Sequence, residues 1–168
     1  AEVREQLLLG VFPAQANMLA DIQELNGRGR AEVSLHRIKE APPQITGTLA
    51  LDNAQLRKDD FLLSQLRGEI DFTGTEIKAE KMDATISESP IQIAFMLRDY
   101  ASQDGIFDLR VDSTGMKSGI ITRLLLSSGS VNDPGIVRGS VRYQGSLTNK
   151  NKRSFTGSLD LVDVQLAT

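Results

Sequence analysis

The residues that could do covalent chemistry in this chain are few and stand apart from one another. His36 is the single histidine, and it lies between apolar residues in the segment SLHRI at positions 34–38. A histidine that acts as a general base needs a nucleophile within hydrogen-bond reach, and no nucleophile motif accompanies this one. The chain also contains no cysteine, which excludes thiolate nucleophiles, disulfides and thiolate metal sites. We therefore interpret His36 as an ordinary histidine on the surface or rim of the fold.

The carboxylates are numerous but scattered along the chain. The aspartates do not show the spacing of a calcium loop, and the segment NDPG at 132–135 is typical of a turn. A pair of carboxylates for glycoside cleavage stays open as an alternative, because strands can bring distant residues together. The residue types thus predict no catalytic residue, no metal site and no cofactor, and we expect the chain not to be an enzyme.

The charge of the chain gives little reason to expect a nucleic-acid partner. The formal net charge is -3, so no long-range positive field would gather phosphates. The basic cluster of Lys150, Lys152 and Arg153 lies in a polar stretch typical of a hairpin tip, with a phosphate or headgroup contact as the alternative. The segment GRGR at 27–30 follows a predicted helix and opens a predicted strand, which is the wrong order for a dinucleotide site.

Most of the chain alternates apolar and polar residues with the period of a half-buried strand. This alternation covers positions 45–51, 66–72, 91–97, 107–111 and 137–143. The links between these segments are short and polar, which favours antiparallel neighbours over parallel strands with long crossovers. The pattern predicts a mostly β fold, an antiparallel meander with one apolar face and one polar face.

Two or three short amphipathic helices are expected beside the strands. Residues 13–25 have Pro13 at the first helical position, an apolar face, and Asn26 with Gly27 as the stop signal. Residues 118–128 and residues 2–9 are the other candidates. Because each is apolar on one side only, each is expected to lie against the sheet. No apolar run approaches the roughly 20 residues that are needed to span a bilayer.

An internal repeat divides the chain. The segment ITGTLALDNAQL at 45–56 aligns with FTGSLDLVDVQL at 155–166, half of the aligned positions are identical, and the preceding glycines are equally spaced. We interpret residues 1–136 as a helix plus β-meander repeat unit, and residues 137–168 as the opening strands of a second, partial unit. The chain is accordingly expected to be a piece of something larger.

The apolar face of such a sheet can be covered in two ways. It can form a closed core beneath helices or a second sheet, or it can line an open concave groove that receives an apolar ligand. Both arrangements require the same alternation of inward and outward side chains. The period of the pattern therefore leaves the two alternatives open.

The run from Leu25 to Leu97 resembles the C-terminal region of the AsmA-like proteins of Gram-negative bacteria. The resemblance rests on LNGRGRAEVSL, ITGTLALDNAQL, LLSQLRGEIDFTGTEIKAEKMDATISESPIQIAFMLRDY and FDLRVDSTGMK, and VRGSVRYQGSL restarts the pattern. It implies a sheet curled into an open half-barrel, a taco-like groove with an aliphatic interior. It also implies a periplasmic segment of a bridge that a helix outside this chain anchors in the inner membrane.

The resemblance further implies a lipid-binding and lipid-guiding β-groove that serves phospholipid transport and outer-membrane homeostasis. The implied partners are a phospholipid or other acyl-chain ligand and adjoining repeat units of the same larger chain, with membrane contact only through parts outside this chain. The alternative is a structural or adaptor β domain of envelope assembly with a closed apolar core and no ligand. The predicted groove lining consists of Ile45, Leu49, Leu51, Leu66, Ile70, Phe72, Ile86, Ile91, Ile93, Phe95, Leu97, Phe107, Leu109 and Val111.

Overall fold

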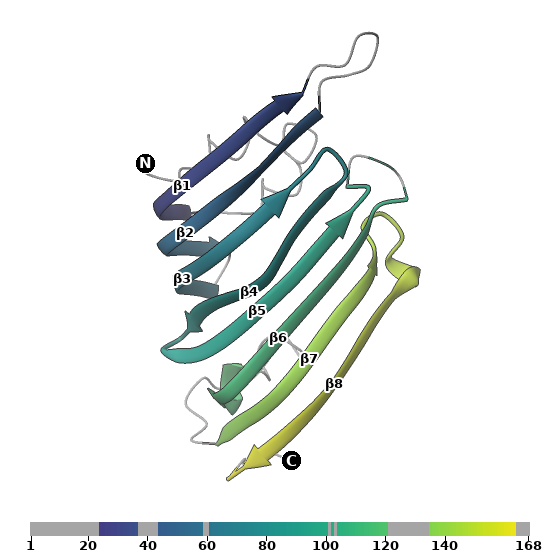
Figure 1. Cartoon of the computed structure of the whole chain (residues 1–168). Coiled ribbons are helices and arrows are strands. Elements are labelled where there is room, and N and C mark those ends of the chain that lie inside the picture. The colour runs from purple at the N-terminus through teal and green to yellow at the C-terminus, as the bar shows by residue number, and fades with distance from the viewer. Residues whose placement is uncertain are drawn as a thin grey trace.

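Eight strands form one antiparallel sheet in the computed structural model, which describes residues 24–36, 44–58, 61–100, 102, 104–120 and 135–163. Each strand pairs with the next one along the chain, so the sheet order runs from β1 to β8 without a crossover (Figure 1). This confirms the predicted mostly β fold built from antiparallel strands. The strands are β1 (Glu24–His36), β2 (Gln44–Lys58), β3 (Phe61–Phe72), β4 (Glu76–Ile86), β5 (Ser89–Arg98), β6 (Ile106–Lys117), β7 (Ile136–Ser146) and β8 (Arg153–Val162).

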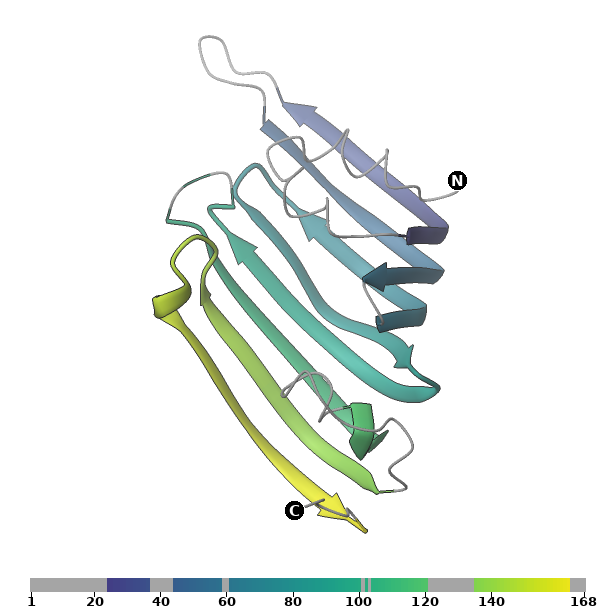
Figure 2. The ribbon, with the colours of Figure 1, turned by 180° about the vertical axis from the view of Figure 1, so that it is seen from behind.

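The sheet is open at both ends. Among the described strands, β1 pairs only with β2 and β8 pairs only with β7, so each has one unpaired side. Figures 1 and 2 show the strands stacked obliquely in a strongly twisted sheet, with β1 and β8 at opposite ends. The twist follows from the steric preference of L-residues in extended strands.

The pairing register places most of the large apolar residues of the eight strands on one side of the sheet, whereas Met96, Ile106, Ile136 and Val162 point to the other side. Leu49 on β2 lies opposite Ala31 on β1 and Ile70 on β3. Farther along the sheet, Ile93 on β5 lies opposite Met82 on β4 and Val111 on β6. Residues directly opposite each other in a ladder point to the same face, so these matches extend across the whole sheet.

We call this side the apolar face and the opposite side the polar face. The apolar face consists of Ala31, Val33 and Leu35 on β1; Ile45, Leu49, Leu51 and Ala54 on β2; Leu66, Ile70 and Phe72 on β3; Ile77, Ala79, Met82, Ala84 and Ile86 on β4; Ile91, Ile93, Phe95 and Leu97 on β5; Phe107, Leu109, Val111 and Met116 on β6; Val137, Val141 and Tyr143 on β7; and Phe155, Leu159 and Leu161 on β8.

β-Bulges change the phase of the alternation within several strands. On β4, Ala79 lies on the apolar face, and the next residue on that face is Met82, because the register shifts between the two. On β2 the shift lies next to Asn53, whose φ of 58° falls in the left-handed region. An extra residue in a bulge leaves the ladder and bends its strand.

The bulges of β1, β2 and β3 coincide with a bend of the sheet. Their register shifts lie towards the start of β1, the end of β2 and the start of β3. Figures 1 and 2 show these strand ends turning towards the side that Figure 2 presents. Residues 118–120 lie on the same side, and Ile120 packs in the apolar cluster. The bend therefore folds this part of the sheet around its apolar face.

Glycine permits two close approaches between neighbouring strands. A Cβ atom at Gly47 would overlap the carbonyl oxygen of Glu32 on β1 and would lie 2.7 Å from the Cζ atom of Phe72 on β3. Gly27 has a φ of 156°, and a Cβ atom there would lie 2.5 Å from the Cα atom of Ala54. Gly27 lies inside β1, which begins at Glu24, so its predicted role as a helix stop with Asn26 is wrong, whereas the predicted close strand packing is confirmed.

The expected helices correspond only in part to the described residues. The helix predicted over residues 13–25 is wrong at its end, because Leu25 lies in β1, opposite Leu56 on β2. Pairing with a distant strand outweighs a local helical pattern here. Residues 118–120 are helical, whereas residues 2–9, 13–23 and 121–128 lie outside the described residues.

The complete helix within the described ranges is the short 3-10 helix η2 (Lys150–Lys152). It sits between β7 and β8, so the basic cluster does lie at a hairpin tip, as predicted. The side chain of Asn149 caps the start of η2 by accepting a hydrogen bond from the backbone N–H of Asn151. The described residues therefore do not show the two or three amphipathic helices that were expected.

Candidate functional site

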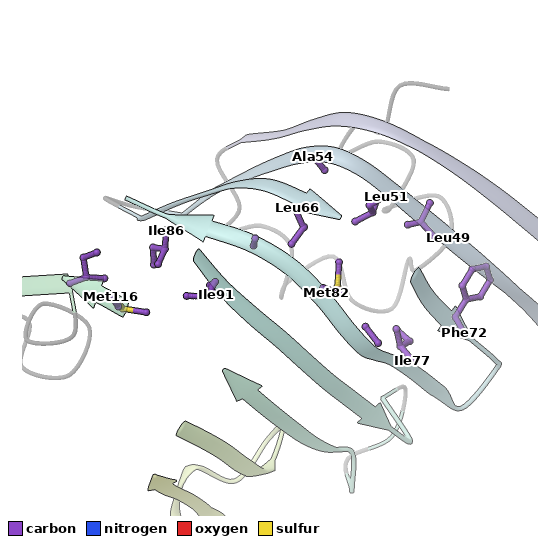
Figure 3. Packing of buried hydrophobic residues seen from close by; sticks show 13 residues of the cluster. Leu49, Leu51, Ala54, Leu66, Phe72, Ile77, Met82, Ile86, Ile91 and Met116 are labelled. Atoms are coloured by element: carbon purple, nitrogen blue, oxygen red, sulfur yellow. The ribbon is translucent and has the colours of Figure 1, made fainter. Parts of the chain in front are cut away.

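The middle of the apolar face holds most of the buried apolar side chains among the described residues. Figure 3 shows Leu49 and Leu51 from β2 and Met82 from β4 on the inner side of the curved sheet, pointing towards a shared interior. Met82 is only 2% exposed. Cross-strand packing of this kind removes apolar surface from water, at roughly 25 cal/mol per Å².

The predicted lining residues all lie on the apolar face, but their exposure differs. Ile45 is exposed. The residues of β5 and β6 are mostly half-buried, and this set includes Ile93, Phe95, Leu97, Phe107, Leu109 and Val111, together with Ile70 of β3. The buried ones are Leu49, Leu51, Leu66, Phe72, Ile86 and Ile91. The pairing register thus brings these residues together on one surface, while their contact with a ligand stays a prediction.

The apolar face opens towards solvent at both lateral ends of the sheet. On β1, Val33 is 56% exposed and Leu35 is 66% exposed. On β8, Phe155 is 50% exposed and Leu161 is 57% exposed. Side chains of this size on adjoining positions of one face form an apolar surface, and such surfaces commonly bind ligands or partners.

Sequence reasoning missed part of this face. The predicted lining omits the apolar residues of β4, apart from Ile86, because their alternation changes phase between Ala79 and Met82. Two short apolar runs of opposite phase, separated by the charged pair Glu80 and Lys81, were the available signal. The outer strands also contribute residues that the predicted lining omitted, namely Val33, Leu35, Val137, Val141, Tyr143, Phe155, Leu159 and Leu161.

Three aromatic residues form a row at one end of the apolar face, across β6, β7 and β8. The ring centroids of Phe107 and Tyr143 are 4.8 Å apart, and those of Tyr143 and Phe155 are 6.5 Å apart. The guanidinium of Arg153 lies 5.6 Å from the centroid of Phe107. The same guanidinium donates hydrogen bonds to the carbonyl oxygens of Ser146 and Leu147. Arg153 therefore ties the β7–β8 hairpin to the aromatic row.

The polar face carries cross-strand ion pairs. Arg142 on β7 donates two hydrogen bonds to Asp108 on β6. The Nε atom of Arg98 on β5 lies 2.9 Å from the Oε2 atom of Glu76 on β4. The hydrogen bonds from Arg142 hold the pKa of Asp108 below its usual value. The arginine of each pair is exposed to solvent, so we expect each pair to contribute little to stability.

Asp112 on β6 shows how two opposing effects set a pKa on this face. Partial burial tends to raise its pKa, but hydrogen bonds from Arg110 and Ser140, with the positive charge of Arg110, outweigh burial and lower it. The Nε atom of Arg110 lies 2.9 Å from a carboxylate oxygen of Asp112. Both Asp108 and Asp112 are thus held in the ionised form, which suits a solvated surface rather than a general acid.

A large hollow among the described residues lies on the polar face. Its volume is about 790 Å³, and its lining includes Arg67, Asp83, Gln92, Asp112 and Ser158. The carboxylates in it are spread over several strands, and the described part of the chain contains no cluster of histidine, cysteine, aspartate and glutamate that could hold a metal ion. His36 is exposed at the end of β1. The hollow accordingly offers polar hydrogen-bonding groups, among them the carboxylates of Asp83, Asp112 and Asp160.

Comparison with protein-family models, with curated proteins and with solved structures found no match to this chain. In the described ranges, no helix has both the length and the apolar character that crossing a membrane requires. The geometry of the described strands favours the apolar face over the polar hollow as a candidate site, because the apolar face is continuous over eight strands and has exposed side chains on both β1 and β8.

Proposed function

We propose that this chain is a lipid-binding and lipid-guiding β-groove segment, whose apolar face holds the acyl chain of a phospholipid. The observation that carries the proposal is the continuity of the apolar face across all eight strands, together with its exposure on β1 and β8. A closed globular core has no need of exposed aliphatic and aromatic side chains at both lateral ends. A surface that an elongated apolar ligand crosses from one end to the other does need them.

The physical chemistry of the face suits an acyl chain. Each CH₂ group that leaves water for an apolar surface gains roughly 0.8 kcal/mol. Aliphatic side chains such as Ile93, Leu109 and Val141 supply this gain without directional contacts, so a chain can slide along them. No covalent step is required for this function, and we propose that the chain is not an enzyme.

The bend of the sheet supports a groove on the apolar side. The bulged ends of β1, β2 and β3 turn towards that side (Figure 2), and the labelled apolar residues Leu51, Leu66 and Met82 lie on the same side of the curved strands (Figure 3). The half-buried residues of β5 and β6 continue this surface towards β8. We propose that the sheet forms the wall of a taco-like half-barrel.

The proposed setting comes from the sequence resemblance to the AsmA-like proteins. In this setting the segment is periplasmic, belongs to a larger inner-membrane-anchored protein, and adjoins further repeat units of the same chain. It contributes to phospholipid transport and outer-membrane homeostasis. Its polar face, with cross-strand pairs such as Arg142 with Asp108, keeps the outside of the wall in water.

A photoreactive fatty acid tests the proposal at the level of single residues. The protein is incubated with palmitic acid that carries a diazirine near the chain end, irradiated, and mapped by tandem mass spectrometry. Insertion is expected at Leu109 and Val141 on the apolar face. Insertion that favours the neighbouring polar-face residues Arg110 and Arg142 would overturn the proposal.

Native mass spectrometry of protein purified from cells provides the complementary measurement. Co-purifying phospholipid or fatty acid supports the proposal. Apoprotein that also takes up no lipid from phosphatidylethanolamine vesicles would contradict it.

The second candidate function is a structural or adaptor β domain with a closed apolar core. The burial of the central residues Leu49, Leu51, Met82 and Ile91 favours it, because each is less than a tenth exposed in the chain. The two candidates differ at β5 to β8, where a closed core leaves no room for a ligand beside Phe95 and Leu109. Absence of photolabelling there, in a protein that melts cooperatively, is the result expected for the closed core.

A further inference from the structure

The last strand of the sheet repeats the second strand in backbone conformation as well as in sequence. In the alignment of the internal repeat, Asn53 of β2 corresponds to Asp163, which directly follows β8. Both residues have φ in the left-handed region, 58° for Asn53 and 54° for Asp163. A positive φ is uncommon for residues other than glycine. Its recurrence at the corresponding position is a conformational feature that β2 and the end of β8 share.

The two strands differ in what lies on their outer side. β2 pairs with β1 on one side and with β3 on the other. β8 pairs with β7 on one side, and its other side has no partner among the described strands. β8 is 10 residues long and contains neither lysine nor proline, which natural proteins often place on edge strands to prevent pairing.

β2 makes contacts with β3 that have no counterpart on the outer side of β8 among the described residues. Phe72 of β3 lies opposite Gly47, with its ring against the place where a Cβ atom of that glycine would be. Next to it, the hydroxyl of Thr48 donates a hydrogen bond of 2.9 Å to Asp71. Ile70 then lies opposite Leu49 on the apolar face.

β8 offers most of these groups, with Asp160 in place of Ala50, and has no such neighbour among the described strands. Gly157 corresponds to Gly47 and is exposed, and the nearest atoms to a Cβ there belong to Ser140 and Val141 of β7. Ser158 corresponds to Thr48 and keeps the hydroxyl. Leu161 corresponds to Leu51, and it is 57% exposed whereas Leu51 is buried.

We propose that the free edge of β8 is a docking edge for an antiparallel strand built like β3. The docking strand places an aromatic residue opposite Gly157, an acidic residue opposite Ser158 and an aliphatic residue opposite Leu159. Backbone hydrogen bonds provide the attachment, and the apolar side chains of the added strand continue the apolar face beyond Leu161. This inference concerns the edge of the sheet and does not depend on the identity of any lipid.

Disulfide trapping tests the proposed pairing, and the absence of cysteine from the chain makes every engineered thiol unique. The full chain carries either Ser158→Cys or Asp160→Cys. The probe is a synthetic peptide with the sequence of residues 61–75, carrying either D71C or E69C. The β2–β3 register pairs Thr48 with Asp71 and Ala50 with Glu69, so the matched pairs are 158 with 71 and 160 with 69. Opposite Cα atoms in antiparallel strands lie about 4.5–5.5 Å apart, within disulfide range.

The expected result is a yield of mixed disulfide roughly tenfold higher for the two matched pairs than for the two swapped pairs. A chain with Arg30→Cys, on the free edge of β1, serves as the edge control and is expected to give the low yield. Higher yields for the swapped pairs, which a parallel strand would produce, would overturn the proposal. Equal yields for all pairs, or preferential formation of a disulfide-linked dimer of the chain itself, would also overturn it.

The aromatic requirement is tested with unmodified protein. The peptide with Phe72→Ala is expected to bind about fivefold more weakly than the parent peptide, the size of an aromatic cross-strand contact. Equal affinity of the two peptides for the unmodified protein would refute the role of Gly157.

Discussion

Ile93→Asp tests the assignment of the apolar face most directly. Ile93 lies on β5, in the middle of the sheet, opposite Met82 on β4 and Val111 on β6. It is half-buried and packs against the buried cluster. The substitution therefore replaces an aliphatic side chain by a carboxylate whose directly opposite neighbours are apolar.

The expected cost follows from two contributions. Full burial of an isoleucine side chain stabilises a protein by about 1.5–3 kcal/mol, so a half-buried one contributes about 1–2 kcal/mol. A polar group beside apolar neighbours, without a hydrogen-bond partner, costs about 1–3 kcal/mol more. We expect the free energy of unfolding to fall by about 3 kcal/mol, which lowers Tm by roughly 6–12 °C in a protein of this size.

The effect of Ile93→Asp should depend on pH with a definite sign. The partly dehydrated environment raises the pKa of the introduced carboxyl in the folded state above the unfolded value of about 3.9. Protonation then favours the folded state, so the penalty is full where the carboxyl is ionised and falls as the pH approaches the unfolded pKa. The difference in Tm between variant and parent is expected to narrow between pH 7.5 and pH 4.5.

Thermal melts followed by circular dichroism, together with native mass spectrometry for bound lipid, provide the assay. Ala94→Asp is the matched control, because Ala94 is the next residue on β5, points to the polar face and lies opposite Arg110. We expect it to change stability by about 0.5 kcal/mol or less. Equal destabilisation by Ile93→Asp and Ala94→Asp would refute the face assignment. A folded Ile93→Asp protein that has lost lipid supports the open groove, and an unfolded one supports the closed core.

Three further predictions concern the packing and charges of the sheet. Gly47→Ala should lower the free energy of unfolding by about 2–3 kcal/mol in urea titrations, because the added Cβ meets both neighbouring strands. Gly74→Ala is the control: no atom lies within 4 Å of a Cβ there, so the free energy of unfolding should change by about 0.5 kcal/mol or less. Val137→Ala should cost about 2 kcal/mol in the same assay, because Val137 is 1% exposed. The pKa of Asp108 is lowered in the folded state, so its ion pair with Arg142 stabilises the fold above the unfolded pKa, and this stabilisation is lost as the pH falls through the folded pKa. Asp108→Asn should therefore weaken the dependence of the free energy of unfolding on acidic pH, by about 1 kcal/mol at most.

Each of these predictions has a result that contradicts it. Equal stability of the two glycine variants would show that the strands around Gly47 can move apart freely. Val162→Ala, at an exposed position on β8, is the control for Val137→Ala, and a similar loss in both would contradict the burial of Val137. An unchanged slope of stability against pH between pH 3 and pH 7 in Asp108→Asn would mean that the pair with Arg142 has no net effect.

Much of the strand arrangement could be predicted from the sequence. Alternation from Ile45 to Leu51, and again from Ile91 to Leu97, is a local property of an extended chain, so it assigns each side chain to a face without knowledge of the partner strand. Short polar links, such as the one that contains Gly74, indicated that consecutive strands pair. Strand type and the shared face of these segments were therefore predictable.

Positions where the tertiary structure overrides local pattern were not predictable in the same way. On β4 the bulge between Ala79 and Met82 changes the phase of the alternation, so a strict alternation of apolar and polar residues does not continue through this strand. Leu25 follows a helical pattern in the sequence but pairs with Leu56, which is far along the chain. Both outcomes depend on ladder hydrogen bonds formed with distant residues.

The internal repeat also separates what the sequence predicts from what the tertiary structure determines. The sequence alone identified β8 as a counterpart of β2, since Gly47 and Gly157 occupy equivalent positions in matching segments. The pairing with the preceding strand is nevertheless different, because Leu49 lies opposite Ala31 whereas its counterpart Leu159 lies opposite Gly139. The sequence identity of the two repeat segments and the alternation of apolar and polar residues are local properties of the sequence. Register, the bend of the sheet and the exposure of its edges were decided only by the three-dimensional structure, because they arise from contacts between residues far apart along the chain.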